Sequence, residues 1–393
     1  MQPILDGPRA DLNSAMVAGL LQGDPSITVD YGAEWFDDTL TLVDDISEYM
    51  TEGSTVTSDV TATIHRTCSL LFDSDVPFNY ITDFVKPYMV LTNNDTGFAA
   101  RFNLGVYTLQ TPQSDNSTSP SVLTFTGYDL IYYLSQPIGD SYEVPIGVDP
   151  IGVAATLINV AVPGANVNAV LSGVLTTQVY TWPFDASNNF TYLDVVNALL
   201  AMVGYQNVWV DWDGNFQLIP YIDPQTTPVE WDFDLTDPNN IVAEQRSSIQ
   251  DFFDVPNWWR FVMNNLTVPP VEGTSQITYI DTQATNPGSF TNRGRYIKRI
   301  YYVDAVDFPS LFTAAVVQIT ADLGPAETFD ISTSPFPLAW HRDIIQLFDP
   351  NLGLVKPALS PLRRVIATKW TIDLDGTSDM TWTLDTVSAV QPV

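Results

Sequence analysis

Residues that form disulfides and zinc sites are scarce in this sequence. Its 393 residues include one cysteine, Cys68, and two histidines, His65 and His341. A single cysteine cannot close an internal disulfide, and a structural zinc site needs four Cys or His ligands. The sequence therefore predicts no disulfide and no zinc site, so the stability of the fold has to come from packing.

Positive charge is scarce as well. Lys and Arg number 15 against 46 Asp and Glu, of which 38 are Asp, and the formal net charge is −31. Proteins bind phosphate backbones and anionic lipid mainly through Lys and Arg side chains that displace counterions. The composition therefore disfavours stable binding of nucleic acid.

The chain also lacks a long uninterrupted apolar run. Its most apolar stretch, residues 151–175, is broken by Pro163 and by several Asn and Ser residues, which would be costly in hydrocarbon. Residues 1–21 have no cationic region and only a short apolar run, in contrast to a secretion signal. We therefore expect neither a membrane span nor a signal peptide.

Apolar residues are nevertheless abundant, at 45% with 12% aromatics, so the chain can bury a core. Thr, Val and the aromatic residues suit strands, and 28 Pro with 21 Gly supply turns. Single cores stop growing near ~250 to 300 residues, which this chain exceeds. The composition predicts a mainly β protein with at least two domains.

Alternation of apolar and polar residues predicts strands in the first third of the chain. Residues 55–66 alternate like one half-buried antiparallel strand. Residues 102–109 and 122–126 alternate again around a polar loop, which predicts a long hairpin leading into a short helix near Tyr128.

A change to helical periodicity follows at residue 150. Residues 150–162 predict one helix, and a second begins at Thr191, whose capping box includes Asp194 and whose end is marked by Gly204. The dipeptide Asp213-Gly214 then predicts a tight hairpin. Together these elements predict a small α+β unit.

Strand patterns return beyond residue 225, with one predicted helix from Pro309 to Leu323 and a terminal hairpin around Asp375-Gly376. No repeat with a period of roughly 20 to 50 residues is visible, which disfavours solenoids and propellers. We therefore predict three parts: a β domain with an N-terminal arm in residues 1–134, an α+β domain in 135–225 and a second β domain in 226–393.

No residue pattern typical of catalysis stands out. Close pairs such as Asp211/Asp213 are expected by chance among 38 Asp residues, and the segment from Asp211 to Asn215 lacks the glycine and glutamate positions of a calcium loop. His65 and Cys68 lie an odd number of residues apart, so on one strand they would point to opposite faces. Nucleophile-elbow, Walker and zinc-protease motifs are missing. The sequence predicts no enzyme, and we assign no catalytic, cofactor-binding or metal-ligating residue.

One cluster of cations stands out against the acidic background. Arg293, Arg295, Lys298 and Arg299 are four of the 15 basic residues and fall within seven positions. Such a stripe in an acidic protein favours contact with an acidic surface, its own or that of a neighbouring subunit. We predict an inter-subunit contact or a channel wall there, with an ordinary solvated strand as the alternative.

Several segments resemble, in their order, the tail-tip or baseplate hub proteins of long-tailed phages and related tailed viruses, which include minor tail proteins. The resemblance covers roughly residues 25 to 390 and rests on the order of motifs that are individually weak. These motifs are Leu104–Leu109, Phe125–Leu130, Tyr192–Pro220, Asp254–Asn257, Ile331–Thr333 and Asp343–Ile345.

This resemblance implies a structural virion protein at the tail tip, with two β-barrel-like tube domains flanking the α+β domain. Three chains would form a ring of six similar domains that closes the tail tube, adapts it to a threefold tip and forms part of the DNA conduit. The implied neighbours are a distal tail or tube protein above, a fibre or spike protein below and a tape-measure protein in the lumen. An acidic lumen would suit a conduit, because it repels phosphate.

Two other functions stay open at this point. A distal tail or tube adaptor of the same virion would form rings of six copies instead of three. A carbohydrate-binding or glycan-hydrolysing β-protein is suggested by 10 Trp and 17 Tyr beside abundant Asp, although core packing explains aromatics on alternating strands first.

Overall fold

We describe the fold from a computed structural model of the chain. It describes residues 26–95, 97–115, 121–183, 189–235, 242–264, 269–284, 286–323, 326–338, 342–349, 364–374 and 380–387. Within these residues, no helix has the length and apolar character needed to span a membrane. The protein is mainly β with few helices, as its composition predicts.

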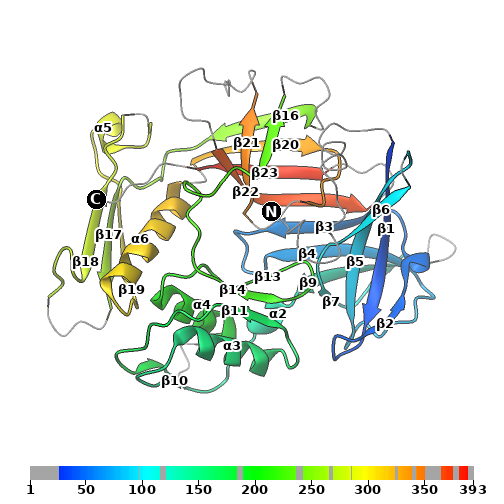
Figure 1. The fold of residues 1–393 in the computed structure, drawn as a ribbon, viewed down its shortest axis with the longest axis horizontal. Helices are drawn as coiled ribbons and strands as arrows, with labels where there is room; N and C mark the ends of the chain where they lie inside the picture. Colours follow the sequence, from blue (N-terminus) through cyan, green and yellow to red (C-terminus); the bar gives the residue numbers. More distant parts are fainter. Residues whose placement is uncertain are drawn as a thin grey trace.

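Most strands belong to one fifteen-stranded sheet, which extends from the top to the right of Figure 1. The predicted terminal hairpin is confirmed as its last two strands, although the turn at 375–376 lies outside the described residues. In chain order the strands are β1 (Ile27–Phe36), β2 (Leu42–Asp45), β3 (Ser54–Asp59), β4 (Arg66–Asp73), β5 (Phe84–Asn93), β6 (Phe98–Asn103), β7 (Tyr107–Leu109), β8 (Gln113–Asp115), β9 (Val122–Asp129), β15 (Trp231–Asp234), β16 (Val242–Gln250), β20 (Glu327–Thr333), β21 (Ile344–Phe348), β22 (Arg364–Leu374) and β23 (Met380–Thr386). A 3-10 turn, η1 (Ser47–Tyr49), follows β2.

Strands from both ends of the chain share this sheet. Hydrogen-bonded neighbours follow the order β16-β20-β23-β22-β3-β4-β9-β7-β5-β1-β2, with β6 beside β5, β8 beside β9, and β21 joining β15 to β22. Because successive side chains alternate between faces, one face carries large apolar residues. Val56, Phe72, Phe125, Trp370 and Trp382 are buried there in one common core.

A smaller α+β unit follows β9 and has its own core. The predicted capping box at the second long helix is confirmed, since Thr191 Oγ1 accepts a hydrogen bond from the backbone N–H of Asp194 at 3.1 Å. Both predicted helices and the tight hairpin are present, and Gly204 and Gly214 have the positive φ angles that these turns require. The elements are α2 (Ile131–Leu134), β10 (Tyr142–Val144), α3 (Pro150–Ala161), β11 (Val167–Ala169), β12 (Tyr180–Trp182), α4 (Tyr192–Met202), β13 (Trp209–Val210) and β14 (Phe216–Leu218).

A third unit is inserted between β16 and β20, at the left of Figure 1. Its sheet has the order β18-β17-β19, and α6 covers one face, where Leu311, Ala315 and Ile319 pack against Trp259 and Phe261. Helix α6 confirms the predicted helix that ends at Leu323. The elements are β17 (Trp258–Met263), β18 (Gln276–Ile280), α5 (Phe290–Arg293), β19 (Lys298–Val303) and α6 (Phe308–Leu323).

Two strand predictions are wrong in extent. The predicted strand 55–66 ends at Asp59, whose carboxylate accepts a hydrogen bond from the backbone N–H of Thr61 and so starts a turn before β4. The predicted long hairpin is real only in part. Strand β7 pairs with β9, whereas Phe102 lies in β6 beside β5, and the chain breaks its strand at Gly105 with φ +117.

Candidate functional site

The main sheet contains the same strand arrangement twice. We define the first strand set as β3, β4, β5, β7 with its continuation β8, and β9; the second strand set is β16, β20, β21, β22 and β23. In the first set, β3 pairs with β4, β4 with β9, β9 with β7, and β7 with β5. In the second set, β16 pairs with β20, β20 with β23, β23 with β22, and β22 with β21. All of these pairs are antiparallel. The two sets therefore have the same connectivity and the same spatial order.

The two sets are joined at a seam between β3 and β22. The register runs from Ser54↔Leu374 to Asp59↔Lys369. On one face of the seam, the hydroxyls of Thr57 and Thr371 lie 2.9 Å apart, while on the other face the apolar side chains enter the common core. Backbone hydrogen bonds and a shared core therefore hold the sets together.

Among the strands that are described, the edges that correspond to this seam lie at the two ends of the doubled arrangement. In the second set, β22 pairs with β21 near its start and with β3 along its remainder. In the first set, β7 likewise pairs with β5, but its continuation β8 has only β9 as a neighbour in the part of the chain that is described. Strand β16 similarly has only β20 beside it among the described strands. A strand at the edge of a sheet can pair with another chain.

The face of the sheet opposite the common core is lined mainly by hydroxyl and carboxylate groups. Lys369 is the one cation in two neighbouring rows of directly paired residues, and its Nζ lies 3.8 Å from an Asp59 oxygen. Hydroxyl groups bind phosphate weakly and carboxylates repel it, because affinity for phosphate comes mainly from cations. One row consists of Ser332, Thr381, Thr371, Thr57, Thr67, Tyr128 and Thr108, and the next of Ser247, Asp330, Thr383, Lys369 and Asp59. We call these rows the polar face.

The four predicted site residues lie close together in the third unit but do not act as one patch. Arg293 donates to the backbone carbonyl of Val255 at 3.2 Å, so it holds a loop. Arg299 pairs with Asp322 of α6 at 2.8 Å. Arg295 and Lys298 are exposed, and among the described residues neither forms an ion pair within 4.0 Å.

The strand alternation of β19 separates these cations. Arg299 lies on the face that packs on α6, because it is paired with the buried Trp259. Lys298 lies on the opposite face beside Trp258, with its Nζ 5.1 Å from the centre of that ring, which is within reach of a cation–π contact. The sequence shows that these cations are close together, but it could not show which of them face outward.

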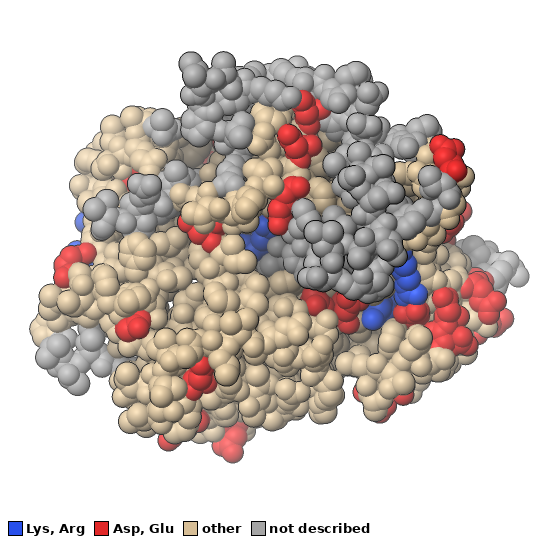
Figure 2. Space-filling view, viewed as in Figure 1, with Lys and Arg blue, Asp and Glu red and all other residues tan. Residues whose placement is uncertain are grey.

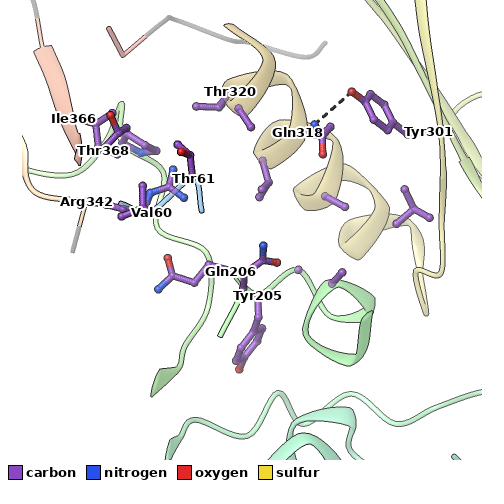
Figure 3. A pocket seen from close by; sticks show the side chains of 18 of the residues that line it. Val60, Thr61, Tyr205, Gln206, Tyr301, Gln318, Thr320, Arg342, Ile366 and Thr368 are labelled. Atoms are coloured by element: carbon purple, nitrogen blue, oxygen red, sulfur yellow. Dashed lines mark hydrogen bonds between the residues drawn. The ribbon is translucent and has the colours of Figure 1, made fainter. Parts of the chain in front are cut away.

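A cavity of about 690 Å³ lies where the main sheet, the α+β unit and the third unit meet. Figure 3 shows Arg342, Thr61 and Thr368 on the side of the main sheet, Gln206 after α4, and Gln318 on α6. A hydrogen bond of 3.3 Å joins Gln318 to the hydroxyl of Tyr301 in β19. Side chains from all three units therefore line the cavity.

Burial changes the ionisation of the groups around this cavity. It raises the pKa of Asp385 to about 6, although Thr368 and Arg342 act in the opposite direction. Burial lowers the pKa of His65 to about 4, so its imidazole is neutral at pH 7. Arg342 has a left-handed backbone with φ 59, and burial also lowers the pKa of its guanidinium. The cavity thus has a partly buried cation, Arg342, beside the carboxyl group of Asp385, whose pKa burial raises.

The other sequence candidates have structural roles. Asp211 accepts backbone hydrogen bonds from Asp213 and Asn215, which confirms a hairpin turn in place of a calcium loop. Cys68 is buried in the common core, and His65 lies outside that core at the cavity. His341 lies outside the described residues. In the described part of the chain, no group of three or more His, Cys, Asp or Glu residues is placed to hold a metal ion.

Comparison with known proteins identifies the fold. No protein-family model and no curated protein matches the chain. The tail protein from Neisseria meningitidis MC58 matches with a TM-score of 0.57 at 13% identity, over 91% of this chain and 96% of that chain. The 43 kDa tail protein of prophage MuSo2 from Shewanella oneidensis matches with a TM-score of 0.58 at 11% identity, over 93% and 99%. A prophage tail protein from Listeria monocytogenes EGD-e matches with a TM-score of 0.53 at 8% identity, over 90% and 94%. The chain therefore has the fold of solved phage tail proteins.

Proposed function

We propose that this chain is a structural virion protein that forms the central hub of the tail tip or baseplate of a tailed virus. The fold likeness to phage tail proteins supports the general class. The observation that carries the specific role is the doubled strand set, with one seam closed inside the chain and the corresponding strands, β8 and β16, at the edges of the described sheet.

The closed seam is a template for the contact between copies. In the proposed assembly, β8 of one copy pairs with β16 of the next, in the antiparallel sense of β22 and β3. A head-to-tail contact of this kind forms a ring if the rotation per copy closes, and a filament if it does not. Because each copy has two strand sets, three copies would form a ring of six similar sets, which adapts a sixfold tube to a threefold tip.

The polar face supports the role of this ring as a DNA conduit. In the proposed ring the polar face lines the lumen. Hydroxyl and carboxylate groups attract phosphate weakly or repel it, so a passing genome would not be retained. The acidic net charge of −31 acts in the same direction.

The proposed location is the tail tip of the virion, assembled in the host cytoplasm. A distal tail or tube protein would bind above the ring, a fibre or spike protein below it, and a tape-measure protein inside it. The ring would close the tube before infection. This role is structural and requires no catalytic residue.

The first test is the mass of the purified protein in solution, measured by light scattering at low salt and in molar KCl. High salt is included because it shortens the Debye length to ~3 Å and so screens the self-repulsion of an acidic chain. A mass three times 43.5 kDa at either salt is expected for the hub. Electron microscopy of the same sample should show rings with six similar lobes.

Two other results would change the assignment. Six copies per ring would favour the distal tail or tube adaptor over the hub. A strict monomer at both salts and at high concentration would contradict self-assembly through β8 and β16.

A further inference from the structure

The outward face of β19 combines cations with exposed apolar side chains. Ile300 is 53% exposed and Tyr302 is 70% exposed, and they flank the half-buried Tyr301 along the strand. Lys298 lies on the same face, and Arg260 of the neighbouring β17 is paired with Ile300. We call Lys298, Ile300, Tyr302 and Arg260 the β19 face.

This combination is unusual for the surface of this protein. The chain has only 15 cations against 46 acids, yet the β19 face concentrates cations, and Arg295 adds an exposed cation nearby. Neighbouring exposed apolar side chains that are surrounded by charged residues are typical of protein contact sites, whereas single exposed apolar side chains are common on any surface. The β19 face therefore has the chemistry of a surface that binds an acidic and partly apolar partner.

A surface with the complementary chemistry is formed by the edge strand β2. Leu42 is 53% exposed and Val43 is 47% exposed, and the exposed Asp44 and Asp45 follow them. Asp38 adds a further exposed carboxylate in the turn before β2. Figure 2 shows acidic side chains gathered at the end of the molecule where Figure 1 places β1 and β2. We call Leu42 to Asp45 with Asp38 the β2 edge.

The two surfaces lie at opposite ends of the long axis of the molecule, with β17 to β19 on the left and β2 on the right of Figure 1. The β19 face and the β2 edge of one chain therefore cannot contact each other, but those of two neighbouring copies can. The third unit, which carries the β19 face, begins with β17, the next strand after β16, and the β2 edge is attached through β1 and β5 to the strand set that contains β8. A copy that offers β8 to a neighbour's β16 therefore brings its β2 edge to the side of the neighbour's β19 face.

We propose that the β19 face of one copy binds the β2 edge of the next copy, as an outer contact that adds to the pairing of β8 with β16. This inference rests on the proposed ring. Opposite charges on the two surfaces would speed correct docking and exclude the reversed orientation, while Ile300, Tyr302, Leu42 and Val43 would lose water on contact. Residues of the third unit would thereby set the orientation in which the partner docks, before the strands at the sheet edges pair.

Charge exchange tests this contact directly. Lys298→Glu reverses the charge on the β19 face, and Asp44→Lys reverses it on the β2 edge. Each is expected to lower the association constant of the ring by at least roughly tenfold, since the contact occurs at every junction. The combined variant keeps the net charge of the wild type and is expected to recover most of the association. Sedimentation velocity over a dilution series gives these constants.

Matched variants separate this effect from net charge and from folding. Lys369→Glu makes the same charge change as Lys298→Glu but lies on the polar face, so it should leave association within about threefold of the wild type. Asp44→Lys reduces the overall self-repulsion, so a loss of association there cannot come from net charge. Tyr302→Thr keeps strand propensity and should also weaken the ring. Melting temperatures near that of the wild type confirm folding.

The outcomes distinguish this contact from the hub itself. If the wild type forms a trimer and Lys298→Glu, Asp44→Lys and Tyr302→Thr form it equally well, the contact is wrong while the hub stands. If association is lost but the combined variant recovers nothing, the two surfaces do not meet each other. If the wild type never associates, the proposed ring fails and this contact fails with it.

Discussion

The edge of the first strand set at β3 is closed, whereas the edge at its other end, β8, is open among the strands that the structure describes. The closed edge is satisfied by β22 of the same chain, through antiparallel pairing and a common core. The open edge has the same place relative to β5 and β9 that β22 has relative to β21 and β23. The comparison indicates that one geometry is used twice, once within a chain and once, as we propose, between chains.

The largest effect is expected in the core that both sets share. Trp382→Ala in β23 and Phe125→Ala in β9 remove a large buried ring from the last strand of each set. Trp382 also donates a hydrogen bond to Thr333 at 2.9 Å. Each substitution should lower the free energy of unfolding by about 3 to 5 kcal/mol. Denaturant melts should keep one transition, with Thr381→Ala on the opposite, exposed face as a control; two separate transitions would show that the sets fold independently.

The next effect concerns the open edge β16. In an antiparallel pair, backbone N–H groups of successive residues point to opposite sides, so Ser247 and Ser248 differ in direction. Proline at the residue whose N–H faces β20 should cost about 3 kcal/mol or more. Proline at the other should leave the melting temperature almost unchanged but abolish ring formation. Light scattering and thermal melts on the two variants check this, and a ring formed by both would contradict pairing at β16.

A pH effect compares the buried carboxyl groups near the ends of β9 and β23. Burial raises the pKa of Asp129 to about 7 and that of Asp385 to about 6. A folded-state pKa above the ordinary value means that the folded protein binds the proton more tightly than the unfolded chain, so stability falls as pH rises through these values. The melting temperature should therefore rise on acidification from pH 8 to pH 5.

Asparagine variants sharpen that comparison. Asp385→Asn should flatten the profile below about pH 6, whereas Asp129→Asn should flatten it up to about pH 7, because each removes one titrating group. Melting temperatures at half-unit pH steps resolve the two windows. A profile that neither variant changes would show that the acid response comes from general charge repulsion instead.

The smallest effect is expected at the surface of the seam. Lys369 and Asp59 are partly exposed and 3.8 Å apart, so Lys369→Ala should change the free energy of unfolding by about 0.5 kcal/mol or less. Thr57→Val should cost about 1 kcal/mol, because Thr371 loses a hydrogen-bond partner at 2.9 Å. Denaturant titration distinguishes the two. A larger loss for Lys369→Ala would mean that the ion pair contributes more to the seam than its exposure indicates.

The local elements were predictable because their signals lie within a few residues. The capping box at Thr191, the helix ending at Leu323 and the hairpin at Asp213-Gly214 all occur as predicted. The strand 55–66 was predicted too long, since alternation continues in sequence beyond Asp59 although the backbone turns there. The sequence shows the alternating Thr residues of that segment. It gives no local sign that Thr57 pairs with Thr371, which in turn pairs with Thr381, on two other strands.

The sequence alone also shows where the cations cluster, but not which group each cation contacts. Arg293, Lys298 and Arg299 are neighbours in sequence, and strand alternation together with the position of α6 directs them to a loop, to solvent and to Asp322 respectively. The third unit was not predicted, since its strands carry the same kind of alternation as those of the main sheet. Likewise, nothing in the residues around His65 and Arg342 indicated that they meet at one cavity.

By itself the sequence determined the β-rich composition, the acidic charge and the helices and tight turns, because residue type, caps and periodicity act over a few positions. Only the tertiary structure decided that β3 lies beside β22, whose contacting residues Thr57 and Thr371 are 314 positions apart. Strand edges present the same N–H and C=O groups whatever their side chains. The choice of neighbour, and with it the doubled arrangement, is therefore set by burial of the common core over the whole chain.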